Sequence, residues 1–174
     1  MNITLHRTLM VCVLAGALAL AIALVAAPTP AFAGGATQIS GVAVYDDPGE
    51  CVDPEGADAT YVPLDMTGDL EGCLYTFVED STSSPSGTYR ETGTELFVGS
   101  YLGGSGTFET TYRFEAKYED VANLSGEIFG RCQHPIVEGS GTGIYEGVSG
   151  ILLFKDVLEG DNAPYFPYRG HLRY

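Results

Sequence analysis

The amino-acid sequence predicts an all-β protein, and three features support that prediction. No segment after residue 33 shows an apolar period of 3.6 residues over a useful length. Instead, seven or eight strand-like segments recur, with Gly, Pro, Asn, Asp and Ser between them. The connections are short, so we expect an antiparallel meander that closes into an eight-stranded barrel without exposed edges. A two-sheet sandwich is the competing architecture.

The expected strands follow one another along the chain. We place them at residues 38–45, 61–67, 71–79, 88–101, 107–119, 124–132, 150–158 and 165–174. An acidic, proline-rich loop follows the first strand, and Gly68 with Asp69 gives a hairpin signal between the second and third strands. Residues 80–87 have the composition of a surface turn.

The segment 107–119 has the clearest strand pattern in the sequence. One face of this strand would carry Phe108, Thr110, Tyr112, Phe114, Ala116 and Tyr118, and the other Glu109, Thr111, Arg113, Glu115, Lys117 and Glu119. We expect the apolar face to point into the barrel and the charged face to meet water. About eight strands enclose an interior just wide enough for side chains or one small ligand, so function depends on what fills it.

Residues 139–156 combine a glycine-rich run with an apolar strand. The glycines permit positive φ angles and bulges, and a short loop around residues 145–147 predicts a tight hairpin. The run lacks the G-x-G-x-x-G spacing, has no Lys at the Walker position and precedes no helix. It therefore does not predict a phosphate-binding loop.

The N-terminal segment has the features of a secretory signal peptide. Residues 1–7 carry a positive charge, residues 9–27 are apolar, and residues 31–33 (Ala-Phe-Ala) offer a small-x-small cleavage pattern. We expect cleavage after this pattern, one domain over residues 34–174 and a secreted protein. An uncleaved membrane anchor is the alternative, because the apolar run approaches the length that spans a bilayer.

The charge of the chain argues against two classes of partner. The net charge is −15, with 23 Asp and Glu against 8 Lys and Arg. All the acidic residues follow residue 33 whereas Arg7 precedes it, so the mature chain is more acidic still. Such a protein repels phosphate backbones and anionic lipid heads, and we expect neither nucleic acid nor a membrane surface as its partner. The sequence leaves the oligomeric state open.

Three cysteines remain after residue 33, in a compartment where disulfides persist. Cys51 and Cys73 flank the same acidic loop, so we favour that pair, and Cys73 with Cys132 is the alternative. The sequence contains no C-x-x-C pair, and only His134 and His171 remain as histidines. We therefore predict no metal site and expect both histidines to be structural or exposed.

Two segments near the C-terminus form a recognisable pattern. Residues 141–150 read Gly-Thr-Gly-Ile-Tyr-Glu-Gly-Val-Ser-Gly, and the last strand contains Tyr-Arg-Gly-His-Leu at 168–172. Together they resemble the C-terminal half of the allene oxide cyclase barrel, which is related in shape to dirigent proteins. The resemblance extends from about Leu96 to the C-terminus, and the chain is also similar to small secreted bacterial proteins of this barrel type. It implies an eight-stranded antiparallel barrel with a largely apolar cavity and no cofactor.

The resemblance also implies two catalytic positions. Plant cyclases place a carboxylate near the start of the first strand and a cysteine on an inner strand, both inside the cavity. Asp46 and Cys73 match these places, with Asp where the plant enzymes have Glu. Cyclases of this shape hold a reactive chain in a folded, desolvated pose, so they need a shaped cavity and one carboxylate.

Aromatic residues on the strands are the candidate ligand contacts. Such residues either fill a core or line a cavity and hydrogen-bond a ligand. The candidates are Tyr75, Phe108, Tyr112, Phe114, Phe154 and Tyr168. Glu91 and Asp156 are further carboxylates in strands, and Asp156 is either an inward acid or a charge at the strand end.

The sequence supports three functional hypotheses. The first is a secreted barrel that binds one small apolar molecule in its interior. The second is a cofactor-independent cyclase or isomerase similar to allene oxide cyclase, and the third is a structural module whose acidic surface meets a partner. The hypotheses differ in whether the barrel centre is open and in whether Asp46 and Cys73 face one cavity.

Overall fold

The computed structural model describes residues 35–46, 49–54, 58–159 and 163–174. The strands in these ranges are β1 (Thr37–Tyr45), β2 (Leu64–Gly68), β3 (Glu71–Ser83), β4 (Thr88–Tyr101), β5 (Gly104–Asp120), β6 (Ser125–Pro135), β7 (Ser149–Lys155) and β8 (Tyr165–Arg173), and one short helix is η1 (Gly143–Tyr145). The segment expected to be a signal peptide, residues 1–33, lies outside the described residues.

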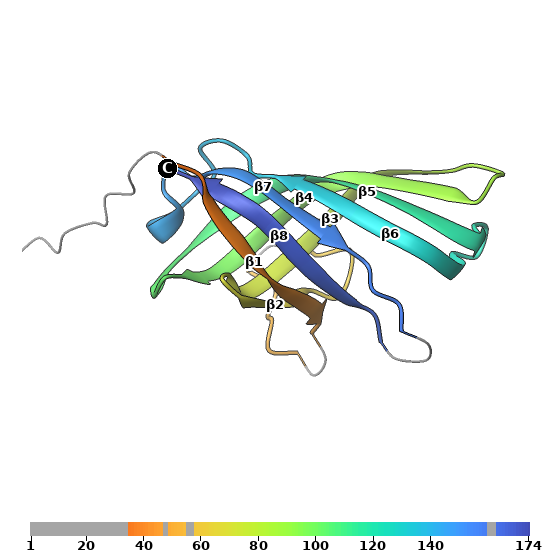
Figure 1. Cartoon of the computed structure of the whole chain (residues 1–174), viewed down its shortest axis with the longest axis horizontal. Helices are drawn as coiled ribbons and strands as arrows, with labels where there is room; N and C mark the ends of the chain where they lie inside the picture. Colours follow the sequence, from red (N-terminus) through yellow and green to blue (C-terminus); the bar gives the residue numbers. More distant parts are fainter. Residues whose placement is uncertain (1–34, 47–48, 55–57, 160–162) are drawn as a thin grey trace, which may run out of the picture. The chain divides into compact units, whose positions relative to one another are not determined.

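The strands form one closed antiparallel barrel (Figure 1). Each strand is hydrogen-bonded to its neighbours in the chain, and β1 pairs with β8 to close the sheet. The closing register places Ala43 opposite Phe166 and Ile39 opposite Gly170. The predicted eight-stranded barrel is therefore confirmed, and the sandwich alternative is wrong. Closure pairs every strand on both sides, which removes the edges on which other chains could pair.

The hairpin of β3 and β4 is longer than predicted. Residues 80–83, expected in a surface turn, pair with the first half of β4, with Asp80 opposite Thr92 and Ser83 opposite Tyr89. A register shift between Val78 and Asp80 marks a β-bulge that precedes this extension. The Ser and Thr side chains suggested a turn, but pairing with a regular neighbouring strand overrides that local preference.

The interior is built from alternate residues of the strands. On β5, Phe108, Thr110, Tyr112 and Ala116 are buried, whereas Glu109, Thr111, Arg113 and Glu119 are exposed, as predicted. The register continues this inner face around the barrel, since Phe114 lies opposite Cys132 and Cys132 lies opposite Phe154. Inward side chains of neighbouring strands therefore lie side by side at the same level along the barrel.

One end of the barrel is filled by the connection between β6 and β7. Residues 136–148 carry η1, and the ring of Tyr145 packs edge-on against Phe108 and Phe97, with centroids 5.0 and 5.8 Å away. Phe97 and Phe108 are themselves stacked at 4.9 Å, and all three side chains are fully buried. The predicted tight hairpin around residues 145–147 is wrong, because this connection is a longer segment that plugs the barrel end.

The backbone of the plug depends on a glycine and on bonds to β5. Gly143 has φ of +59°, and a side chain there would collide with the carbonyl oxygen of Ser105. The N–H of Thr142 donates to the Thr107 carbonyl at 2.8 Å, and the Thr107 N–H donates to the Thr142 hydroxyl at 3.1 Å. These contacts hold Tyr145 in place over the core.

The loop between β1 and β2 is tied to the outer face of β3. A disulfide joins Cys51 to Cys73, which confirms the favoured pairing. On the same face of β3, the hydroxyl of Tyr75 donates to the carbonyl of Val52 at 2.8 Å. The loop is therefore fixed at two points near its start, and Cys132 remains a free cysteine.

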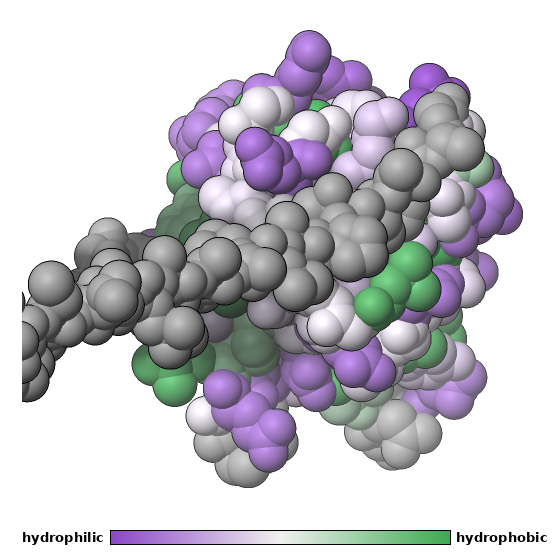
Figure 2. Space-filling view, turned by 90° about the vertical axis from the view of Figure 1, so that its left-hand side faces the viewer, coloured by the Kyte–Doolittle hydropathy of each residue, from purple (hydrophilic) through white to green (hydrophobic). Residues whose placement is uncertain are grey.

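The barrel end beside the C-terminus carries many hydrophilic side chains. Figure 2 faces this end and shows hydrophilic residues around much of its margin, with hydrophobic patches between them. Among the residues that the structure describes, no helix has both the length and the hydropathy to cross a bilayer.

Tyr145→Ala should lower the free energy of unfolding by about 3–5 kcal/mol, because it removes a buried ring and leaves a void beside Phe97 and Phe108. Urea denaturation followed by circular dichroism measures this change. Glu146 is exposed next to the plug, so Glu146→Ala should change stability by no more than about 0.5 kcal/mol. Equal effects of the two substitutions would contradict the plug role of Tyr145.

The double substitution Cys51→Ser with Cys73→Ser should destabilise the fold by about 2–4 kcal/mol, since it frees the loop that the disulfide closes. Denaturation of the wild type with and without a reductant provides the control. Reductant should lower wild-type stability to the level of the double variant and leave the variant unchanged. A variant that responds to reductant as strongly as the wild type would contradict this assignment.

Candidate functional site

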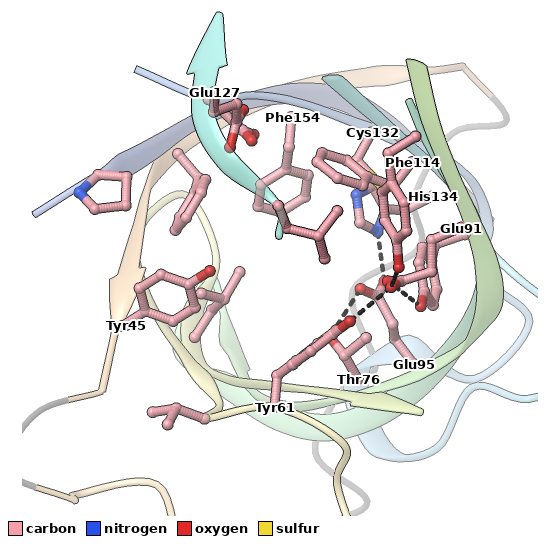
Figure 3. A pocket seen from close by; sticks show the side chains of 18 of the residues that line it. Tyr45, Tyr61, Thr76, Glu91, Glu95, Phe114, Glu127, Cys132, His134 and Phe154 are labelled. Atoms are coloured by element: carbon pink, nitrogen blue, oxygen red, sulfur yellow. Dashed lines mark hydrogen bonds and ion pairs between the residues drawn. The ribbon is translucent and has the colours of Figure 1, made fainter. Parts of the chain in front are cut away.

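The half of the barrel interior opposite the plug contains a cavity of about 280 Å³ (Figure 3). All eight strands contribute to its wall, together with residues of the β1–β2, β5–β6 and β7–β8 connections. Tyr61, Val62 and Leu124 line the cavity although their side chains are 46%, 56% and 46% exposed. They therefore form an apolar rim where the cavity meets solvent.

Much of the cavity wall is aromatic or aliphatic. The apolar part of the wall includes Tyr45, Leu64, Phe114, Phe154, Pro164 and Phe166. Tyr45 and Phe166 pack edge to face, with ring centroids 5.2 Å apart, and the Phe154 ring lies 4.5 Å from that of His134. A wall of this kind suits the apolar body of a small molecule.

Glu91 lies in the wall as the centre of a tyrosine cluster. Its side chain is only 4% exposed. The hydroxyls of Tyr61 and Tyr89 both donate to Oε2 at 2.6 Å, and the hydroxyl of Tyr112 donates to Oε1 at 2.7 Å. Burial and the bond to Glu91 raise the pKa of Tyr112 above its usual value, so this hydroxyl stays a donor. Three donors satisfy the buried carboxylate and fix the tyrosine rings around it.

Glu95 and His134 form a second buried pair on the same wall, 3% and 4% exposed. The Nδ1 atom of His134 contacts Glu95 Oε2, which also accepts from the Thr110 hydroxyl at 2.8 Å. The Thr76 hydroxyl donates to Glu95 Oε1 at 3.2 Å. A carboxylate accepts hydrogen bonds, so His134 Nδ1 carries its proton, whereas Nε2 has no partner among the described residues.

Glu127 and Asp156 form an acidic pair on another part of the wall. Both carboxylates lie over Gly130, where a side chain would collide with Asp156 and approach Glu127 Oε1 to 2.6 Å. Burial, and then the interaction with Glu127, raise the pKa of Asp156 to about 8. Two carboxyl groups this close do not both ionise at neutral pH, so the pair holds a proton.

Cys132 lines the cavity between these polar groups. Burial, and then the charge of Glu95, raise the pKa of its thiol well above the usual range. The protonated thiol is a weak nucleophile, because the thiolate is the reactive form of cysteine. The geometry therefore presents Cys132 as part of the wall and not as a reactive group.

The structure brings half of the predicted ligand contacts into the cavity. Tyr112, Phe114 and Phe154 line it. Phe108 belongs to the plugged core, and Tyr168 is buried with its hydroxyl bonded to the backbone of Leu70 at 2.9 Å. Tyr75 faces the outer surface under the β1–β2 loop. These last three residues do not line the cavity.

The two positions implied by the family resemblance lie away from the cavity wall. The carboxylate of Asp46 accepts the N–H groups of Glu50 at 3.0 Å and Cys51 at 2.8 Å, so it caps the β1–β2 loop. The sulfur of Cys73 is bonded to Cys51 and is not a free thiol. Neither residue belongs to the cavity lining.

Glu95, His134, Glu127 and Tyr61 are among the cavity residues that the sequence did not predict as site residues. Glu95 points to the same face of β4 as Glu91, so the alternation of buried and exposed residues along β4 could have predicted that Glu95 faces inward. His134 was expected to be structural or exposed, and its pairing with Glu95 joins residues 39 apart in the chain. Glu127 lies beside a bulge in the pairing of β5 with β6, and Tyr61 lies in a loop. Neither position gives a periodic signal in the sequence.

Comparisons of the chain with protein-family models, with curated proteins and with solved structures gave no match. The site is therefore interpreted from its own geometry.

Asp156→Asn should flatten the dependence of stability on pH. The folded protein holds a proton on Asp156 up to about pH 8, whereas the unfolded chain releases it near the ordinary pKa of 3.8. The contribution of Asp156 to stability is therefore fully present below that lower pKa and is lost as pH rises toward 8, by up to about 1.4 kcal/mol per pH unit. Thermal unfolding between pH 5 and pH 9 measures the slope.

The exposed Glu119 provides the matched control for this titration. Glu119→Gln should keep the wild-type decline in melting temperature, and Asp156→Asn should lose much of it. An unchanged decline in Asp156→Asn would show that Asp156 does not hold the proton.

Proposed function

We propose that this protein binds a small ligand in the open half of its barrel. The observation that carries the proposal is the division of the interior, with one end filled by the Tyr145 plug and the other holding a cavity of about 280 Å³. A concave, largely aromatic wall with a few fixed polar groups is the usual form of a small-molecule site. The volume suits a ligand smaller than most drugs.

The wall indicates how such a ligand would lie. Its apolar body would contact Phe114, Phe154 and Phe166, and the rim of exposed apolar side chains would be covered on binding. The tyrosines around Glu91 are held by their bonds to the carboxylate, so this part of the wall is formed before the ligand arrives. We therefore expect binding without a large rearrangement of the barrel.

The geometry favours binding over the two other hypotheses. The resemblance to allene oxide cyclase implies Asp46 and Cys73 as the catalytic residues, and both lie outside the cavity lining. A purely structural module has no need of an open interior with polar groups fixed in its wall. A binding role accounts for both the cavity and its buried hydrogen bonds.

We also propose that binding takes place outside the cell, after removal of residues 1–33. The disulfide between Cys51 and Cys73 is of the kind that persists in oxidising compartments. The strongly acidic mature chain would remain soluble there.

N-Phenyl-1-naphthylamine, a neutral apolar fluorophore at pH 7, should gain fluorescence on binding to residues 34–174. Cys132→Phe should abolish most of this gain, because the larger side chain fills the cavity. Gln133→Phe is the matched control, since Gln133 is the exposed neighbour on the outer face. Absence of a signal with the wild type, or equal loss in both variants, would contradict the proposed cavity.

A further inference from the structure

This inference rests on the proposed ligand site and concerns the charge of its occupant. Four carboxylates line the cavity, those of Glu91, Glu95, Glu127 and Asp156. In the part of the chain that the structure describes, no Lys or Arg lines it. Arg90 and Arg131 instead lie on the outer face, where each pairs with Glu115 at 2.9 Å. The cavity therefore has a strong excess of acidic groups over its one histidine.

The polar groups of the cavity wall differ in whether they already have a hydrogen-bond partner. The tyrosine hydroxyls around Glu91 already donate to it. By contrast, His134 Nε2 is buried and has no partner among the described residues, and Glu127 Oε1 has no donor apart from the proton that the carboxyl pair holds. A ligand that brings N–H groups would give Glu127 Oε1 a donor of its own.

Two tyrosines lie near the acidic pair. Tyr45 from β1 and Tyr118 from β5 line the same cavity, and the Tyr118 hydroxyl lies 3.4 Å from Glu127 Oε2. Burial, and then the charges of Asp156 and Glu127, raise the pKa of the Tyr45 hydroxyl. Aromatic faces beside carboxylates are a favourable environment for an organic cation.

We infer that the ligand carries a protonated amine that binds between Glu127 and Asp156, with its apolar body against the aromatic wall of Phe114, Phe154 and Phe166. The amine supplies a hydrogen-bond donor to Glu127 Oε1. It also provides the positive charge that allows both carboxylates to ionise.

Three indoles with nearly equal bodies separate charge from shape. Tryptamine carries a cation, 3-ethylindole is neutral, and indole-3-propionic acid carries an anion at pH 7. Isothermal titration of residues 34–174 should show tryptamine binding at least about tenfold more tightly than 3-ethylindole, as expected for one charge-assisted hydrogen bond. Indole-3-propionic acid should bind more weakly than both.

The double substitution Glu127→Gln with Asp156→Asn should remove the preference for tryptamine and leave the affinity for 3-ethylindole within about threefold. Glu138→Gln with Glu146→Gln is the matched control, because it replaces the same number of carboxyl groups at exposed positions away from the cavity lining. The control should retain the preference. If the double variant does not fold, the three indoles on the wild type decide the question alone.

Tryptamine binding should also release protons at pH 7, because the cation favours ionised Asp156. The titratable groups that face Asp156 are Glu127 and Cys132 from β6, Tyr118 from β5 and Tyr45 from β1. The thiol and hydroxyl pKa values are raised, so Asp156 is the source of the released proton. Titration in buffers with different ionisation enthalpies measures this release.

The outcomes separate this inference from the proposed function. Preference for tryptamine with proton release, lost in the double variant alone, supports both. Equal affinity for tryptamine and 3-ethylindole, no proton release, or equal loss in the surface control would overturn the amine assignment. Binding of N-phenyl-1-naphthylamine without any preference for tryptamine would overturn it while the ligand site stands, and absence of all binding would overturn both.

Discussion

The interior of an eight-stranded barrel is just wide enough for side chains to fill, and this chain fills one half of it with large apolar groups. The rings of Tyr145, Phe97 and Phe108 are fully buried in that half, where the β6–β7 connection folds back over the barrel end. The other half has no such plug among the described residues. The plug thus determines both where the core lies and where a ligand can enter.

The open half is held in shape by hydrogen bonds. Burying a carboxylate is costly unless donors satisfy it, and Glu91 and Glu95 each accept three contacts from neighbouring side chains. These contacts link β3, β4, β5 and β6 with the β1–β2 loop, which the disulfide at Cys51 fastens to the barrel. The polar wall is therefore part of the framework as well as of the site.

The sequence predicts those parts of the fold that depend on local pattern. The predicted strand 88–101 agrees with β4 at both ends. The inner face of β5 follows the alternation in the sequence, because a period of two residues along a strand separates buried from exposed side chains. The plug could not be predicted, because Tyr145 is fixed by tertiary contacts with Phe97 and Phe108. The sequence of β3 does not show which of its faces points into the barrel, because both faces are covered. Tyr75 was therefore predicted to point inward, although it lies on the outer face. The pairing of Glu95 with His134 likewise needs the barrel register.

The most direct test of the divided interior is the NMR response of aromatic side chains to N-phenyl-1-naphthylamine. We predict that the resonances of Tyr112, Phe114 and Phe154, which line the cavity, shift on titration. Phe97, Phe108 and Tyr145, which form the plugged half, should keep their positions in the spectrum. Shifts confined to the plugged half, or an unchanged spectrum at saturating ligand, would contradict it.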